Sequence, residues 1–219
     1  MKLLNKKINF LGDSITEGCG TSGPDAFFTT LIKHSHSLAE AKNYGIGGTR
    51  IARQTVSSPN PITDMDFCLR MSVMEKDADA VVVFGGTNDF GHGDAPIGQP
   101  SDRTPYTFYG ACHVLCQGLK ELFPNSVIAI VTPIHRCGEN SPKGDGSRTT
   151  VCPPLSEYVR ILKEVAEGYN LPVLDLFSAG VLDPNDARVK AELVPDGLHP
   201  NDEGHKILAE KIAEFLISL

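Results

Sequence analysis

The run DAVVVFGG at residues 79–86 limits the folds open to this chain more than any other stretch. Its central residues are all apolar, which is typical of a strand buried on both faces in the middle of a parallel sheet. Similar strand-like runs occur at residues 7–11, 41–46, 126–132 and 172–176. Because segments with helical spacing lie between these runs, we expect an α/β fold built on a mostly parallel five-stranded sheet.

Two segments have a clear helical pattern. In residues 155–169, apolar side chains recur at the i, i+3, i+4, i+7 spacing of one helix face. The segment that contains Leu208 and Leu219 has the same spacing, and Asn201 is predicted to cap the N-terminus of that helix. We expect His205, inside this helix, to be exposed to solvent or to take part in capping.

No linker or internal repeat divides the chain, so we expect a single domain over residues 1–219. The net charge of -7 and the lack of Lys and Arg clusters argue against a nucleic-acid partner. Lys2, Lys6 and Lys7 are followed only by a strand-length apolar run, too short for an export signal or a membrane span. We therefore expect a cytoplasmic protein without a membrane partner, while the sequence leaves the oligomeric state open.

The cysteines give no sign of a disulfide framework or a metal site. The chain contains Cys19, Cys68, Cys112, Cys116, Cys137 and Cys152. Without an export signal, reduced thiols are expected. Cys112 and Cys116 are four residues apart in a helix-like segment, but no second pair completes a tetrahedral zinc set. We expect the cysteines to act as small buried apolar residues, and we expect neither a metal nor a cofactor.

Four motifs with chemically active side chains follow predicted strands or lie near the C-terminus. They are Gly12-Asp13-Ser14, Asn43–Thr49 (NYGIGGT), Gly85–Asp89 (GGTND) and Asp196–Asn201 (DGLHPN). In open parallel sheets, ligand sites form outside the carboxyl ends of the strands. We therefore expect these motifs to meet at one edge of the sheet.

The motif residues match the parts of an acyl-transfer site. His199 lies three residues after Asp196, whose carboxylate can fix one imidazole tautomer and leave the other ring nitrogen free to accept a proton. Ser14 becomes an effective nucleophile when such a base lies within hydrogen-bond distance. The backbone N–H of Gly48 and the side-chain amide of Asn88 can hold the oxyanion.

Each motif alone also has a simpler interpretation. Gly, Asp and Ser are common turn residues, and Asn88 can cap a helix. Asp196 and His199 can form a solvated surface turn. The acyl-transfer hypothesis therefore depends on the occurrence of all four motifs together and in order.

The four motifs resemble those of the SGNH hydrolases, also called the GDSL lipase/esterase family, along nearly the whole chain. GDSIT contains the family's nucleophile, here Ser14; NYGIGG ends in Gly48; GGTND contains Asn88; DGLHPN contains Asp196 and His199. The resemblance implies a flavodoxin-like, three-layer α/β/α sandwich with the serine near the start of a helix. It also implies ester cleavage by a Ser-His-Asp mechanism, with an oxyanion hole formed by Ser14, Gly48 and Asn88.

Two long irregular stretches, residues 86–104 and 133–153, follow strands and are polar. They contain His92, His135 and Arg136, which are candidates for substrate contact because ligand-binding residues concentrate on loops. A long acyl chain would need apolar walls, which these stretches lack. We therefore expect a small-molecule substrate with a short acyl group, acetyl above all, on a polar alcohol such as a sugar.

Two alternatives belong to other functional classes. A flavodoxin-like binding module would use residues 12–18 to hold a phosphate or a cofactor at a helix N-terminus. That function leaves Asp196, His199 and Asn88 without a role. A non-catalytic sugar-binding domain would keep the fold without hydrolysing esters.

Overall fold

The computed structural model describes residues 1–219 and is built around one five-stranded sheet. The strands are β1 (Lys7–Gly12), β2 (Glu40–Gly45), β3 (Ala80–Phe84), β4 (Val127–Val131) and β5 (Val173–Leu174). Their order is β2-β1-β3-β4-β5, and every neighbouring pair is parallel. The predicted α/β fold with a five-stranded sheet is confirmed, although β5, at the edge, is shorter than the predicted run at residues 172–176.

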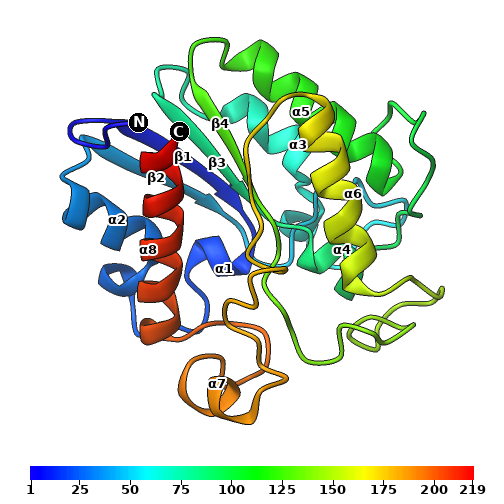
Figure 1. Cartoon of the computed structure of the whole chain (residues 1–219). Helices are drawn as coiled ribbons and strands as arrows, with labels where there is room; N and C mark the ends of the chain where they lie inside the picture. The colour runs from blue at the N-terminus through cyan, green and yellow to red at the C-terminus, as the bar shows by residue number, and fades with distance from the viewer.

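Helices cover both faces of the sheet, which gives the three layers that the family resemblance implies (Figure 1). They are α1 (Ser14–Glu17), α2 (Phe28–His36), α3 (Phe67–Arg70), α4 (Thr87–Gly91), α5 (Phe108–Leu122), α6 (Leu155–Gly168), α7 (Ala187–Glu192) and α8 (Asp202–Ser218). Side chains of a strand alternate between its two faces. Accordingly, Val82 and Phe84 of β3 share a core with α2 and α8, whereas Val81 and Val83 share a core with α5 and α6.

The position of β1 determines where the functional motifs meet. β1 lies between β2 and β3, so the chain leaves β1 toward one edge of the sheet and returns to continue toward the other. Such a switch in strand order opens a crevice at the carboxyl ends of the two central strands. The motifs that follow β1, β2 and β3 are thereby placed side by side.

The stretch at residues 86–104 is predicted to be irregular, but the structure shows that it begins with α4. The sequence TNDFG has little intrinsic helix preference, since Asn, Asp and Gly are weak helix formers. All five residues of α4 are buried, so tertiary packing stabilises this short helix. The stretch at residues 133–153 contains no helix or strand.

His205 is buried, contrary to the prediction that it is exposed to solvent. Its exposed fraction is 0%. Its Nδ1 accepts the backbone N–H of Phe28 at 3.1 Å, and its ring stacks on the Phe28 ring. The residue lies on the same helix face as Leu208 and Ile212, so it enters the core together with the apolar side chains of α8.

The N-terminus of α8 has the predicted cap. Asn201 caps α8 as predicted, since its side chain accepts the N–H of Gly204 at 3.1 Å.

All six cysteines are free, and Cys112 and Cys116 are buried in α5, as expected, but Cys19 is exposed and Cys137 is half-buried. No helix combines the length and the apolar character needed to cross a bilayer.

Candidate active site

Ser14 lies where β1 ends and α1 begins. Asp13 is the N-cap of α1, and its carboxylate accepts the N–H of Ile15 at 3.0 Å. Burial raises the pKa of Asp13 to about 6, while the hydrogen bond from Ile15 opposes this increase. Gly12 allows α1 to pack closely against the end of β1, because a Cβ there would lie 1.9 Å from Oγ1 of Thr16. Ser14 is thus held at the carboxyl end of a central strand.

The structure brings Ser14, His199 and Asp196 into one hydrogen-bonded series. Oγ of Ser14 lies 2.9 Å from Nε2 of His199. On the other side of the ring, Nδ1 of His199 lies 2.7 Å from Oδ2 of Asp196. Since the carboxylate can only accept, Nδ1 donates to it, and Nε2 is left facing the hydroxyl of Ser14.

The loop at residues 196–199 holds Asp196 by its own backbone. Oδ1 of Asp196 accepts the N–H of Leu198 at 2.8 Å and that of His199 at 2.7 Å. Burial disfavours ionisation of Asp196, but these hydrogen bonds and the His199 ring outweigh it, so the pKa of Asp196 lies below its ordinary value. Gly197 has a φ of +82°, and a Cβ there would lie 2.6 Å from Sγ of Cys137. This close turn therefore requires glycine.

Gly48 lies in the loop after β2, and Asn88 lies in α4 after β3. Gly48 has a φ of +74°, and its N–H makes no hydrogen bond within the protein. Asn88, the second residue of α4, donates from its side-chain amide to the carbonyl oxygen of Thr49 at 3.0 Å. A Cβ at the adjacent Gly47 would lie 3.6 Å from Cβ of Ser14, so this loop packs directly against the serine.

Two acidic residues, one just after the first motif and one inside the third, hold this loop in place. Oε2 of Glu17 accepts the N–H of Gly47 at 2.8 Å. The carboxylate of Asp89 accepts the N–H groups of Ile51 and Ala52 at 2.9 and 2.8 Å. Burial raises the pKa of Asp89 to about 7, and both hydrogen bonds oppose that increase. Sequence reasoning did not identify either carboxylate as a support for the loop.

Arg70 also supports the site and was not identified from the sequence. Its exposed fraction is 3%. Its guanidinium donates to the carbonyl oxygen of Gly12 at 2.9 Å, to Oγ1 of Thr49 at 2.7 Å, and to the carbonyl oxygen of Tyr44. One side chain therefore connects the carboxyl ends of β1 and β2 with the loop that contains Gly48. The only sequence feature that could have indicated this supporting role is the presence of an arginine in an otherwise apolar segment.

His92 lies next to Gly48, at the end of α4. Its Nε2 is 3.2 Å from the carbonyl oxygen of Gly48, and its Nδ1 is 3.0 Å from Oδ2 of Asp145. The ring therefore joins the loop after β2 to the stretch at residues 133–153. Contact of His92 with substrate stays a prediction.

His135 and Arg136 both make contacts within the protein. The ring of His135 lies 2.9 Å from Oε2 of Glu139 and 2.9 Å from the carbonyl oxygen of Phe177. Arg136 is buried and donates to the carbonyl oxygen of Thr87 at 3.2 Å, beside the motif that contains Asn88. Contact of these two side chains with substrate also stays a prediction. No three His, Cys, Asp or Glu side chains are grouped as a metal site requires.

The chain matches one family model and several solved structures. The model of the GDSL-like lipase/acylhydrolase family matches residues 10–207. A solved structure from Lactobacillus plantarum is 28% identical, with a TM-score of 0.82 over 98% of this chain and 98% of that chain. The comparison with curated proteins gives no match.

Two more distant structures share the fold. An acetyl xylan esterase is 24% identical, with a TM-score of 0.64 over 95% of this chain and 98% of that chain. An acetyl-xylooligosaccharide esterase from Geobacillus is 21% identical, with a TM-score of 0.63 over 99% of this chain and 96% of that chain. The family match covers most of the chain, so the chain belongs to the GDSL-like lipase/acylhydrolase family and is a carboxylic ester hydrolase.

Proposed function

We propose that the protein removes short acyl groups, acetyl above all, from polar alcohols such as sugars, and that Ser14 forms the acyl-enzyme. The observation that carries the proposal is the series Ser14–His199–Asp196, with distances of 2.9 and 2.7 Å between its members. A serine hydroxyl is a weak nucleophile until a base accepts its proton, and this geometry supplies the base.

The mechanism has two steps. Oγ of Ser14 attacks the acyl carbon while Nε2 of His199 accepts the proton, and Asp196 stabilises the imidazolium. The N–H groups of Ser14 and Gly48 and the side-chain amide of Asn88 hold the oxyanion. His199 then protonates the departing alcohol. In the second step it takes a proton from a water molecule that attacks the acyl carbon, and it gives that proton to Oγ of Ser14 as the bond between Ser14 and the acyl group breaks and the acid is released.

The polarity of the surrounding loops supports a short acyl group. The stretches at residues 86–104 and 133–153 lie after β3 and β4 and contribute Arg103, Asn140 and Arg148 without an extended apolar run. Each methylene removed from water contributes about 0.8 kcal/mol only when apolar walls receive it. The acetyl-sugar esterases among the structural neighbours support the same substrate class.

A series of esters from acetyl to decanoyl on one leaving group tests the proposal. We expect kcat/KM to be highest for the shortest acyl groups and to fall as the chain lengthens, because the polar stretches at residues 86–104 and 133–153 offer few apolar walls to the added methylenes. Mass detection of the released acid identifies the product. Highest efficiency at the long end of the series would contradict the proposal.

A further inference from the structure

A pocket of about 340 Å³ lies next to His92, whose ring contacts the loop that contains Gly48. Three separate segments line it: Arg50 with the loop at residues 54–59, residues 92–94, which follow α4, and residues 147–150. Of its 13 lining residues only one is hydrophobic. Hydroxyl, amide, imidazole and charged groups therefore surround the pocket, together with the apolar parts of the same side chains.

The pocket is connected to the proposed catalytic groups through His92. This side chain lines the pocket, and its Nε2 lies 3.2 Å from the carbonyl oxygen of Gly48. Gly48 follows Gly47, which packs against Ser14. His92 therefore lies between the loop that contains Gly48 and the pocket.

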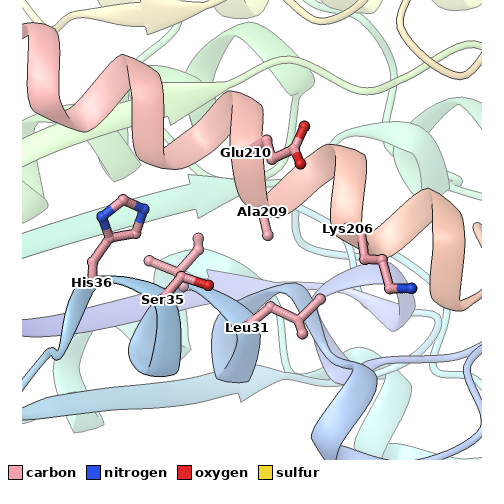
Figure 2. A pocket seen from close by; sticks show the side chains of 7 residues that line it. Leu31, Ser35, His36, Lys206, Ala209 and Glu210 are labelled. Carbon is pink, nitrogen blue, oxygen red and sulfur yellow. The ribbon is translucent and has the colours of Figure 1, made fainter.

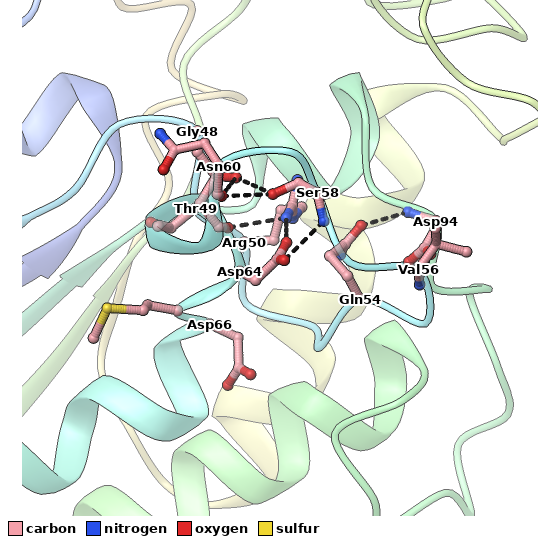
Figure 3. A network of polar contacts seen from close by, with 12 residues as sticks. Gly48, Thr49, Arg50, Gln54, Val56, Ser58, Asn60, Asp64, Asp66 and Asp94 are labelled. Atoms are coloured by element: carbon pink, nitrogen blue, oxygen red, sulfur yellow. Dashed lines mark hydrogen bonds and ion pairs between the residues drawn. The ribbon is translucent and has the colours of Figure 1, made fainter.

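One wall of the pocket is fixed by its own hydrogen bonds (Figure 3). Arg50 donates to Oδ1 of Asp64 at 3.1 Å, and Oδ2 of Asp64 accepts the N–H of Ser58 at 2.8 Å. The side-chain oxygen of Gln54 accepts the N–H of Asp94 at 2.8 Å. A site held in this way is ready for its ligand and loses little conformational freedom on binding.

Carboxylates and guanidinium groups both lie around the pocket and offset each other's charge, so the pocket does not favour an anionic ligand. Arg50 and Arg148 contribute two guanidinium groups. Asp94 lines the pocket, and Asp64 and Asp145 pair with the lining residues Arg50 and His92. The carboxylates therefore offset the guanidinium charges.

Three hydroxyl groups in the pocket remain free to bind a ligand. Ser57, Thr149 and Thr150 line the pocket, and their hydroxyls make no hydrogen bond within the protein. Hydroxyl groups both donate and accept, and so do the hydroxyls of a sugar. A volume near the lower end of the range for ligand pockets, roughly 300–1,000 Å³, suits a small molecule rather than a polymer.

We propose that this pocket binds the alcohol part of the ester, a neutral polyol of about the size of one sugar ring, while the acyl group lies at Ser14. The proposal rests on the proposed function and names its substrate more closely. Ser57 and Thr149 determine specificity for the alcohol and take no part in bond breaking.

The test compares two acetyl esters in the wild type and in the variants Ser57→Leu and Thr149→Leu. One ester is a monoacetylated methyl glycoside, and the other is 4-nitrophenyl acetate, whose flat leaving group offers no hydroxyls. We expect each variant to lower kcat/KM for the glycoside about tenfold, mainly through KM, because a hydrogen bond is lost and leucine fills space. The value for 4-nitrophenyl acetate should change by less than about twofold.

A matched control uses the pocket of about 160 Å³ between α2 and α8, which Ser35, His36 and Lys206 line together with Leu31 and Ala209 (Figure 2). Both Ser35 and Ser57 are exposed serines at a pocket. Ser35→Leu should leave both esters unaffected, because this pocket shares no residue with the proposed site. Thermal unfolding of all variants identifies any change in stability.

The outcomes separate the two proposals. Unchanged hydrolysis of the glycoside by Ser57→Leu and Thr149→Leu, or an equal loss for both esters, would overturn the assignment of the pocket while leaving the proposed function intact. A wild-type protein that hydrolyses neither ester would instead overturn the proposed function.

Discussion

At the scale of single residues, Asn88 offers the clearest test of the oxyanion hole. It is buried in α4, directly after β3, and one of its amide hydrogens is used by the carbonyl oxygen of Thr49. A primary amide has two hydrogens to donate, so the second is available to a ligand. The hydrogen bond to Thr49 fixes the direction in which it points.

Asn88→Ala should lower kcat by a factor that corresponds to about 3 kcal/mol, because one donor to the oxyanion is lost in the transition state. KM should change little. Steady-state kinetics on an acetyl ester measures both values. The control is Asn125→Ala, an exposed asparagine just before β4, at the opposite edge of the sheet, which should retain full activity. A change in KM alone for Asn88→Ala would make Asn88 a substrate-binding residue instead.

The sequence identified the residues whose side chains carry distinctive chemistry, such as Ser14 and His199, because each occurs in a short local motif. It did not identify Arg70, which contacts Gly12, Tyr44 and Thr49 from a different segment. Such a contact depends on how distant segments pack. A residue that supports a loop can be of many types, so no local pattern indicates it.

At the scale of elements, the start of α8 holds the loop that carries His199. Asn201 is the N-cap: its side-chain oxygen accepts the N–H of Gly204 at 3.1 Å. Its side-chain amide donates to the carbonyl oxygen of Glu192, the last residue of α7, at 2.9 Å. One side chain therefore connects two helices on either side of this loop.

Asn201→Ala should lower the free energy of unfolding by about 1–2 kcal/mol, because both the cap and the contact with α7 are lost. Asn201→Asp keeps an acceptor for Gly204 and loses only the donor to Glu192, so its loss should be smaller. Chemical denaturation of the wild type and the two variants measures the difference. Equal stability of Asn201→Ala and the wild type would show that the cap does not stabilise α8.

The elements that the sequence predicted best are those with strong local patterns. The run at residues 79–86 and the helix pattern at residues 155–169 correspond to β3 and α6. α4 was missed because its stability comes from burial of all its residues and not from propensity. His205 was misassigned although the spacing to Leu208 already placed it on the apolar face.

At the scale of the whole molecule, buried titratable groups connect stability with pH. Burial lowers the pKa of His205 from 6.5 to about 4, although Asp202 opposes the decrease and His199 adds to it. Because the folded pKa lies below the unfolded value, the unfolded chain binds a proton first as the pH falls. The contribution of neutral His205 is therefore complete above pH 6.5 and is lost as the pH falls toward 4.

The wild type should lose about 3 kcal/mol of stability relative to His205→Phe between about pH 7.5 and about pH 4. The comparison with His205→Phe is necessary because Asp13 and Asp89 have raised pKa values. Those carboxyl groups lower stability as the pH rises over the same range, and their contributions cancel between the two proteins. Denaturation curves at several pH values measure the difference. Parallel pH dependence of the two proteins would contradict a neutral, buried His205.

The central claim is that Ser14 is the nucleophile, and labelling with diethyl 4-nitrophenyl phosphate tests it most directly, because this reagent reacts with an activated serine. Trypsin releases Ser14 in the peptide at residues 8–33, where no Lys or Arg occurs before Lys33. The account predicts that one label per chain appears on Ser14, in parallel with the loss of activity, and that His199→Ala reacts much more slowly. Loss of activity with the label on another residue, or full activity after Ser14 has been labelled, would contradict it.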